Sequence, residues 1–204
     1  MRLKDEPLLT EALMKKNKLV CGVGANDLER PVYWKENGKY IICPIYKIWK
    51  SMLVRCYDEK FHHRQTYQDC LVAPVWLKLS NFEKWINTQD WEGKELDKDI
   101  LFPGNKVYGP DTCVFVTHAV NIFLIDSGAS RGEYPIGVHW HKHTQKIAAQ
   151  CRNPFTNKTE HLGLFDNAED AHLTWKTRKH EFACQYAEQQ TDPRVAEALR
   201  TRYL

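Results

Sequence analysis

The chain has 204 residues, of which 43% are hydrophobic and 27% are charged. This mix excludes wholesale disorder and leaves room for one large domain or two small ones. The formal net charge is only +3, so a case for nucleic acid depends on where the basic residues lie. The apolar runs are shorter than a bilayer span, and the first residues are charged rather than signal-like. We therefore expect an intracellular protein with no membrane partner, whose seven cysteines are reduced thiols.

Two short elements are predicted in an N-terminal extension, residues 1–43. The apolar positions of residues 1–20 indicate a short amphipathic helix. Two β-rich runs flank Asn37 and Gly38, and Asn-Gly between such runs predicts a hairpin with a tight turn.

Residues 44–125 are predicted to form the first domain. Apolar residues recur at helical spacing over 44–58, which predicts a helix. A second helix is predicted over 80–89, with Ser80 as its N-cap and a glutamate three residues later. Residues 96–121 begin like a strand, pass through two Gly/Pro turns and contain the apolar strand Cys-Val-Phe-Val.

A second, smaller domain is predicted to follow a linker. Residues 126–136 are small and polar, which is typical of a linker. The second domain, residues 137–204, is predicted to contain three strands, a helix over 167–190 that Asn167 caps, and a short helix over 194–203. The predicted fold class is therefore α+β.

Side chains alternate along the middle strand of the second domain. Ile147, Ala149 and Cys151 point toward the predicted helix, whereas the basic and amide side chains point away from it. Arginine and lysine can neutralise phosphates, while arginine and glutamine can read base edges. An ordinary solvated sheet face is the alternative that these residues leave open. The candidate DNA-contacting residues of the sheet are His139, His141, Lys142, Lys146, Gln150, Arg152, Lys158 and His161.

The same stretch carries a family pattern. Its features are Gly137-Val138, Trp140, Lys146 with Ala149, Leu162-Gly163-Leu164-Phe165, and Ala168, Ala171 and Trp175. This pattern resembles the Apetala-type DNA-binding domain of plant ethylene-response factors and their phage relatives, over about the last third of the chain. The resemblance implies a three-stranded antiparallel sheet, packed on one helix, that binds the major groove of double-stranded DNA. The first strand carries histidines where that family is usually richer in arginine.

A second resemblance covers the first domain. Its features include Trp49, Arg55-Cys56-Tyr57, Tyr67, Trp76, Phe82 with Trp85, Leu96-Asp97, Gly104-Asn105, Tyr108 with Pro110, Cys113 with Phe115-Val116, and Asn121. These features resemble phage HNH-type homing endonucleases, which often pair a nuclease core with an Apetala-type module. The resemblance implies a ββα-metal (HNH-like) core that hydrolyses DNA phosphodiesters with Mg²⁺ (or Mn²⁺), in the cytoplasm of a phage-infected host cell.

The nuclease resemblance assigns roles to particular residues. Asp97 and Asn121 fall at metal-ligand positions, and Lys98 falls where the family has its histidine base. A solvated lysine is protonated at neutral pH and cannot accept a proton. Asp99 or His118 is therefore the candidate base.

Two functions remain open at this stage: an active nuclease, or a degenerate core in a protein that only binds DNA. A protein-interaction module is a more remote third hypothesis. Cys56, His62, His63 and Cys70 lie close enough in sequence to bind zinc. No paired Cys-x-x-Cys motif occurs, however, and Cys56 is predicted to pack as a small hydrophobic residue, so we do not expect zinc.

Overall fold

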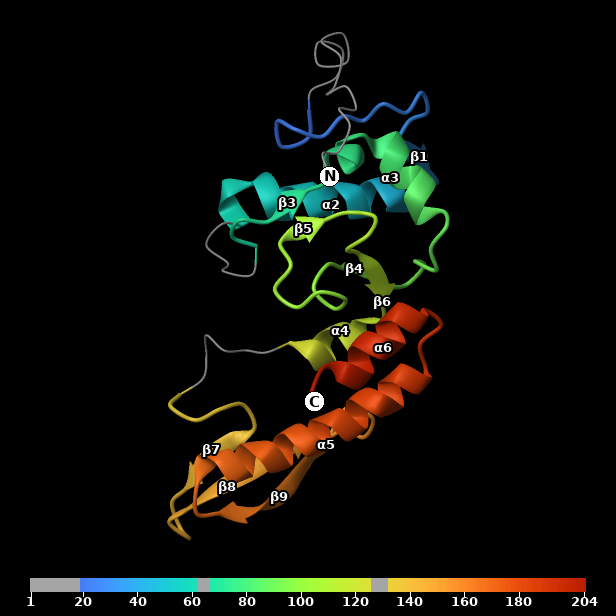
Figure 1. Ribbon diagram of the computed structural model, residues 1–204. Helices are drawn as coiled ribbons and strands as arrows, with labels where there is room; N and C mark the ends of the chain where they lie inside the picture. Colours follow the sequence, from blue (N-terminus) through green and yellow to red (C-terminus); the bar gives the residue numbers. More distant parts are fainter. Residues whose placement is uncertain (1–18, 62–66, 126–131) are drawn as a thin grey trace, which may run out of the picture. The chain divides into compact units, whose positions relative to one another are not determined.

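The computed structural model describes residues 19–61, 67–125 and 132–204, and its mixed α+β fold confirms the predicted class (Figure 1). The chain divides into two compact units, Met1–Phe115 and Val116–Leu204, and each is described by itself. The helix predicted over 1–20 lies almost entirely outside the described residues. Within the described ranges, every helix is too short or too polar to cross a membrane.

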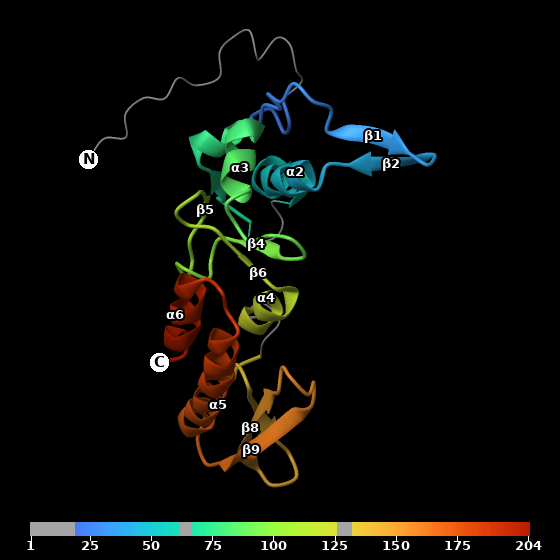
Figure 2. The same cartoon turned by 90° about the vertical axis from the view of Figure 1, so that its right-hand side faces the viewer.

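The first unit carries a two-stranded hairpin. β1 (Tyr33–Glu36) pairs antiparallel with β2 (Lys39–Ile42), and the two strands extend away from α2 (Figure 2). Asn37 and Gly38 join them with φ angles of 49° and 78°, which are the left-handed angles that a two-residue type I′ turn requires. The hairpin predicted from Asn-Gly is confirmed.

The core of the first unit is built around buried tryptophans. Trp49, on α2 (Pro44–Tyr57), is fully buried, and its indole Nε1 donates a hydrogen bond to the backbone oxygen of Trp76 at 2.6 Å. Buried indoles usually need such an acceptor. The ring of Trp76, from the short 3-10 helix η2 (Pro74–Leu77), meets Phe82 edge to face at 5.1 Å. The helix predicted over 44–58 is thus confirmed, and its apolar face is the one that is buried.

The next helix, α3 (Leu79–Ile86), is capped by a residue that is distant in the sequence. Asp27 accepts the backbone N–H of Ser80 through Oδ1 at 2.8 Å and the Ser80 hydroxyl through Oδ2 at 2.6 Å. The prediction that Ser80 is the N-cap is wrong, because Lys78 occupies that position and Ser80 lies within the first turn. A carboxylate at this end also interacts favourably with the helix dipole.

Short strands complete the first unit. They contribute Val72, Leu96, Tyr108 and Phe115 to the same hydrophobic core as Trp49. The pairs are β3 (Leu71–Val72) with β5 (Val107–Tyr108), which run parallel, and β4 (Glu95–Asp97) with β6 (Val114–Val116), while a 3-10 turn, η1 (Glu59–Phe61), follows α2.

The second unit contains the predicted three-stranded antiparallel sheet, in the order β7–β8–β9. The long helix α5 lies across one face of this sheet (Figures 1 and 2). The N-cap prediction is also confirmed, since Asn167 Oδ1 accepts the backbone N–H of Asp170 at 2.8 Å. The elements are β7 (Val138–His141), β8 (Lys146–Arg152), β9 (Thr159–Phe165), α5 (Ala168–Glu188) and α6 (Pro193–Thr201).

A further helix, α4 (His118–Leu124), belongs to the second unit, although the sequence analysis assigned its residues to the first domain. Phe123 accounts for the difference. Its ring lies 5.1 Å from that of Tyr186 on α5 and 6.0 Å from that of Tyr203, and the ammonium of Lys179 stands 3.6 Å above it. The unit boundary therefore falls before α4, whereas the linker was predicted at 126–136.

Candidate nucleic-acid interface

The sheet of the second unit has one covered and one open face. Along β8, Ile147, Ala149 and Cys151 are buried, whereas Lys146, Gln150 and Arg152 are exposed, as the alternation predicts. Ala148, which the same alternation places on the exposed side, is buried as well. On the covered face, Ile147 and Ala149 form a cluster with Ala171 of α5.

Strand register assigns the remaining side chains to faces. His139 pairs with Ala148, and His141 pairs with Lys146. On the other side of β8, a β-bulge at Ala149/Gln150 pairs Gln150 with His161. Residues paired across an antiparallel ladder point to the same side. We call the open side the outer face, and its seven polar residues are His139, His141, Lys146, Gln150, Arg152, Thr159 and His161.

The two other candidates of the sheet region lie in its turns. Lys142 follows β7, Lys158 precedes β9, and both are exposed. The structure therefore gathers on one sheet all eight residues that the sequence analysis proposed, with lysines at its rim.

Several outer-face groups already have weak partners. Lys146 Nζ lies 3.0 Å from a carboxylate oxygen of Asp166, and both side chains are exposed. Arg152 Nη2 donates to Asn157 Oδ1 at 3.4 Å, which is a long hydrogen bond. Exposed ion pairs contribute about 0–1 kcal/mol, so a phosphate can displace them at little cost.

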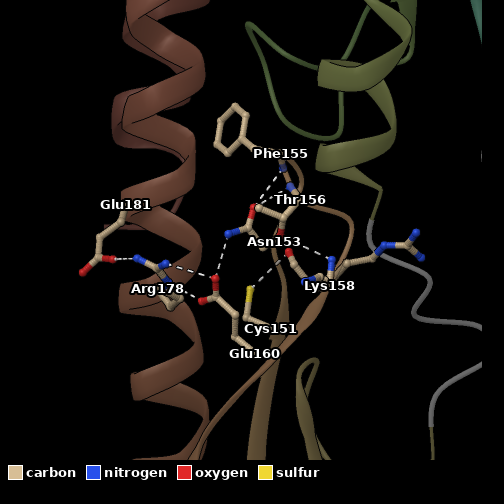
Figure 3. Close-up of polar contacts among 9 residues, drawn as sticks. Cys151, Asn153, Phe155, Thr156, Lys158, Glu160, Arg178 and Glu181 are labelled. Carbon is tan, nitrogen blue, oxygen red and sulfur yellow. Dashed lines mark hydrogen bonds and ion pairs between the residues drawn. The ribbon is translucent and has the colours of Figure 1, made fainter.

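A polar network ties the β8–β9 turn to α5 (Figure 3). Glu160 accepts hydrogen bonds from Arg178 Nε at 2.7 Å and from Asn153 Nδ2 at 2.7 Å. Asn153 Oδ1 in turn accepts the backbone N–H groups of Phe155 and Thr156 at 2.9 and 3.1 Å. The bonds from Arg178 and Asn153 lower the pKa of the Glu160 carboxyl. The acid of β9 is therefore turned toward α5, and its charge is kept off the outer face.

Sequence reasoning did not single out this network, although a signal for it existed. Glu160 pairs with Cys151 across the ladder, and the alternation along β8 predicts that Cys151 points toward the helix. Applied to β9, the same alternation predicts a partner on α5 for Glu160. Arg178 is that partner, and its guanidinium also lies 4.3 Å above the Phe182 ring.

The residues implied by the nuclease resemblance have a different environment. Asp97 Oδ1 accepts the backbone N–H groups of Asp99 and Ile100, both at 2.7 Å. Burial raises the pKa of the Asp97 carboxyl in spite of these two bonds. Lys98 is only 3% exposed, and its Nζ donates to Asp99 Oδ1 at 2.5 Å and to the backbone oxygen of Asn105 at 2.8 Å. The Lys98 ammonium thus connects its own strand end to the backbone at Asn105, seven residues later.

Two of the carboxylates near the magnesium site implied by that resemblance already have partners. One oxygen of Asp97 is engaged by backbone donors, and Asp99 is paired with Lys98. His118 and Asn121 lie on α4, which belongs to the second unit. Among the described residues, no group of three or more His, Cys, Asp or Glu side chains could hold a metal ion.

No protein-family model, curated protein or solved structure matches the chain. Of the residues weighed for zinc, Cys56 and Cys70 are buried in the core of the first unit, and burial raises the pKa of the Cys56 thiol to about 12. His62 and His63 lie outside the described residues.

Proposed function

We propose that this protein binds double-stranded DNA through the outer face of the β7–β9 sheet. The observation that carries the proposal is the sorting of this sheet into a face packed on α5 and an open face that is rich in basic, amide and imidazole side chains. The acid that interrupts β9, Glu160, is held on the packed side by Arg178. The open face therefore presents hydrogen-bond donors and positive charge to a partner.

The dimensions of the sheet suit a DNA groove. Three strands spaced about 4.8 Å apart span roughly 10 Å, and the major groove of B-DNA is about 12 Å wide. Gln150 and Arg152 lie on the central strand, where they would meet base edges. Lys142 and Lys158 lie at the turns, where they would meet phosphates.

A salt titration with single variants tests this proposal. The full chain is added to a labelled mixed-sequence duplex about three helical turns long, and fluorescence anisotropy is followed at several salt concentrations. Arg152→Ala should weaken binding about tenfold or more, and Lys146→Ala should lower the salt slope by about one unit. Arg200→Ala is the matched control, because Arg200 is exposed on α6 rather than on the sheet. Unchanged affinity and slope in both sheet variants would refute the outer face as the site.

DNA cleavage is a separate hypothesis that rests on the HNH-type resemblance, including its ββα-metal core. The pairing of Asp99 favours binding without cleavage, because this candidate base is engaged by the Lys98 ammonium at 2.5 Å. We expect supercoiled plasmid to stay intact with the protein in Mg²⁺ or Mn²⁺. Nicking that disappears in Asp97→Ala would instead establish the nuclease.

A further inference from the structure

The β1–β2 hairpin of the first unit exposes apolar surface on both of its sides. Isolated two-stranded hairpins are marginally stable, and a large exposed apolar patch usually marks a binding site. The hairpin is fixed at its root, where the Tyr33 ring meets the Tyr46 ring of α2 at 5.3 Å and Cys43 N donates to Val32 O at 2.9 Å. Its exposed apolar side chains are Tyr33 (44%), Trp34 (40%), Tyr40 (81%) and Ile42 (42%).

Positive charge is concentrated on the hairpin and the helix that follows it. Residues 33–57 contain five basic residues and a single acid, Glu36, whereas the whole chain has a net charge of only +3. Arg55 is turned inward, where its guanidinium lies 5.2 Å from the Tyr108 ring. The remaining four basic residues, Lys35, Lys39, Lys47 and Lys50, are exposed.

Register interleaves these charges with the aromatic rings. Lys35 pairs with Tyr40 across the ladder, and its Nζ lies 5.8 Å from the centre of that ring. Trp34 pairs with Ile41 on the opposite side. The hairpin therefore combines cations and flat rings on a narrow ribbon, a combination suited to phosphates and to the sugar–base surface of a nucleic acid.

We infer that the β1–β2 hairpin is a second element that contacts duplex DNA, with Lys35 and Lys39 on phosphates and Tyr40, which shares a side of the ribbon with Lys35, against the groove. This inference rests on the proposed function, and it adds a contact from the first unit. The strands are about 4.8 Å apart, and a groove about 12 Å wide admits a two-stranded ribbon. Lys39 faces Glu36 across the ladder, but residues 33–57 still carry five basic residues against one acid, so the charge pattern favours an anionic partner such as DNA over a purely apolar one.

Paired charge variants of the full chain test the inference. In Lys35→Gln/Lys39→Gln the salt slope of binding to the mixed-sequence duplex should fall by about two units. Lys60→Gln/Lys84→Gln is the control with the same change of charge on exposed lysines of the first unit, and it should leave the salt slope unchanged. Tyr40→Ser should weaken binding severalfold while leaving the fold intact, because the Tyr40 side chain is 81% exposed.

The outcomes separate this inference from the proposed function. If outer-face variants lose affinity and hairpin variants do not, the inference is overturned and the proposed function stands. If hairpin variants lose affinity and outer-face variants do not, the outer face is overturned as the binding site and the hairpin contact stands. Absence of duplex binding by the unmodified chain would overturn both. A hairpin variant that converts a dimer into a monomer, with DNA binding intact, would assign the hairpin to an interface between copies.

Discussion

Replacing Gly137 by alanine tests how closely the sheet of the second unit is packed on α5. Gly137 has a φ of 80°, and a Cβ atom at this position would lie 2.0 Å from Cδ1 and 2.3 Å from Cγ of Trp175. The Trp175 side chain is only 6% exposed, so its ring has little room to move. Gly137→Ala should therefore force either the ring or the strand out of place.

The size of the effect has two sources. A non-glycine residue at positive φ costs about 1 kcal/mol, and overpacking of a tight core typically costs about 1–3 kcal/mol. We expect the free energy of unfolding of the second unit to fall by about 3 kcal/mol. Urea denaturation of the full chain, with amide hydrogen exchange of α5 peptides to isolate this unit, gives the value.

A second background separates the two sources. Trp175→Leu removes the ring, so adding Gly137→Ala to it should cost only about 1 kcal/mol. Gly38→Ala is a further control, because Gly38 has a similar φ of 78° and no atom within 4 Å of its ideal Cβ. An equal cost of Gly137→Ala in both backgrounds would refute the close contact with Trp175.

Three other outcomes follow from buried or paired charges. Lys98→Met should lower the free energy of unfolding of the first unit by about 2 kcal/mol, because it leaves Asp99 without its cation, and urea denaturation measures it. Lys98→His, which restores the residue of the HNH pattern, should destabilise similarly and give no nicking of plasmid DNA. Burial lowers the pKa of Lys179 from 10.5 to about 8, so between these two pH values the unfolded chain binds more protons and this group makes stability rise with pH. Lys179→Met should therefore be more stable than the unmodified chain by about 1–2 kcal/mol at pH 7, because the cost of burying the charge exceeds the loss of the cation–π contact with Phe123. This gain in the free energy of unfolding should shrink toward pH 10, which denaturation curves of both proteins at several pH values measure.

Elements fixed by local chemistry could be predicted from the sequence. Asn37 and Gly38 specify a turn by their own backbone preferences, and Asn167 caps the helix that begins beside it. The outer face likewise follows from the alternation of Gln150 and Arg152 with buried neighbours. Each of these features depends on residues within a few positions of one another.

Features that depend on distant contacts could not be predicted in the same way. The burial of Lys98 depends on a hydrogen bond that its ammonium donates to the backbone oxygen of Asn105, seven residues later. The assignment of α4 to the second unit depends on Phe123 meeting Tyr186, and no local pattern indicates that contact. The candidate metal ligands were therefore assigned from a resemblance, and the structure places Asp97 and Asn121 in separate units.

The carboxylate of Asp27 has a consequence for how the first unit forms during synthesis. It caps a helix 53 residues later in the chain, and neighbouring Ala25 exchanges backbone hydrogen bonds with Leu77 and Leu79. Closing a loop of this length is slower than forming local contacts. The contact also cannot form before α3 has been synthesised. Ala25 and Asp27 therefore cannot make these hydrogen bonds until η2 and α3 have left the ribosome. A fragment that starts at Pro44 would retain α2 and α3 but would lack this cap, so the integrity of α3 depends on a carboxylate that is made 53 residues earlier.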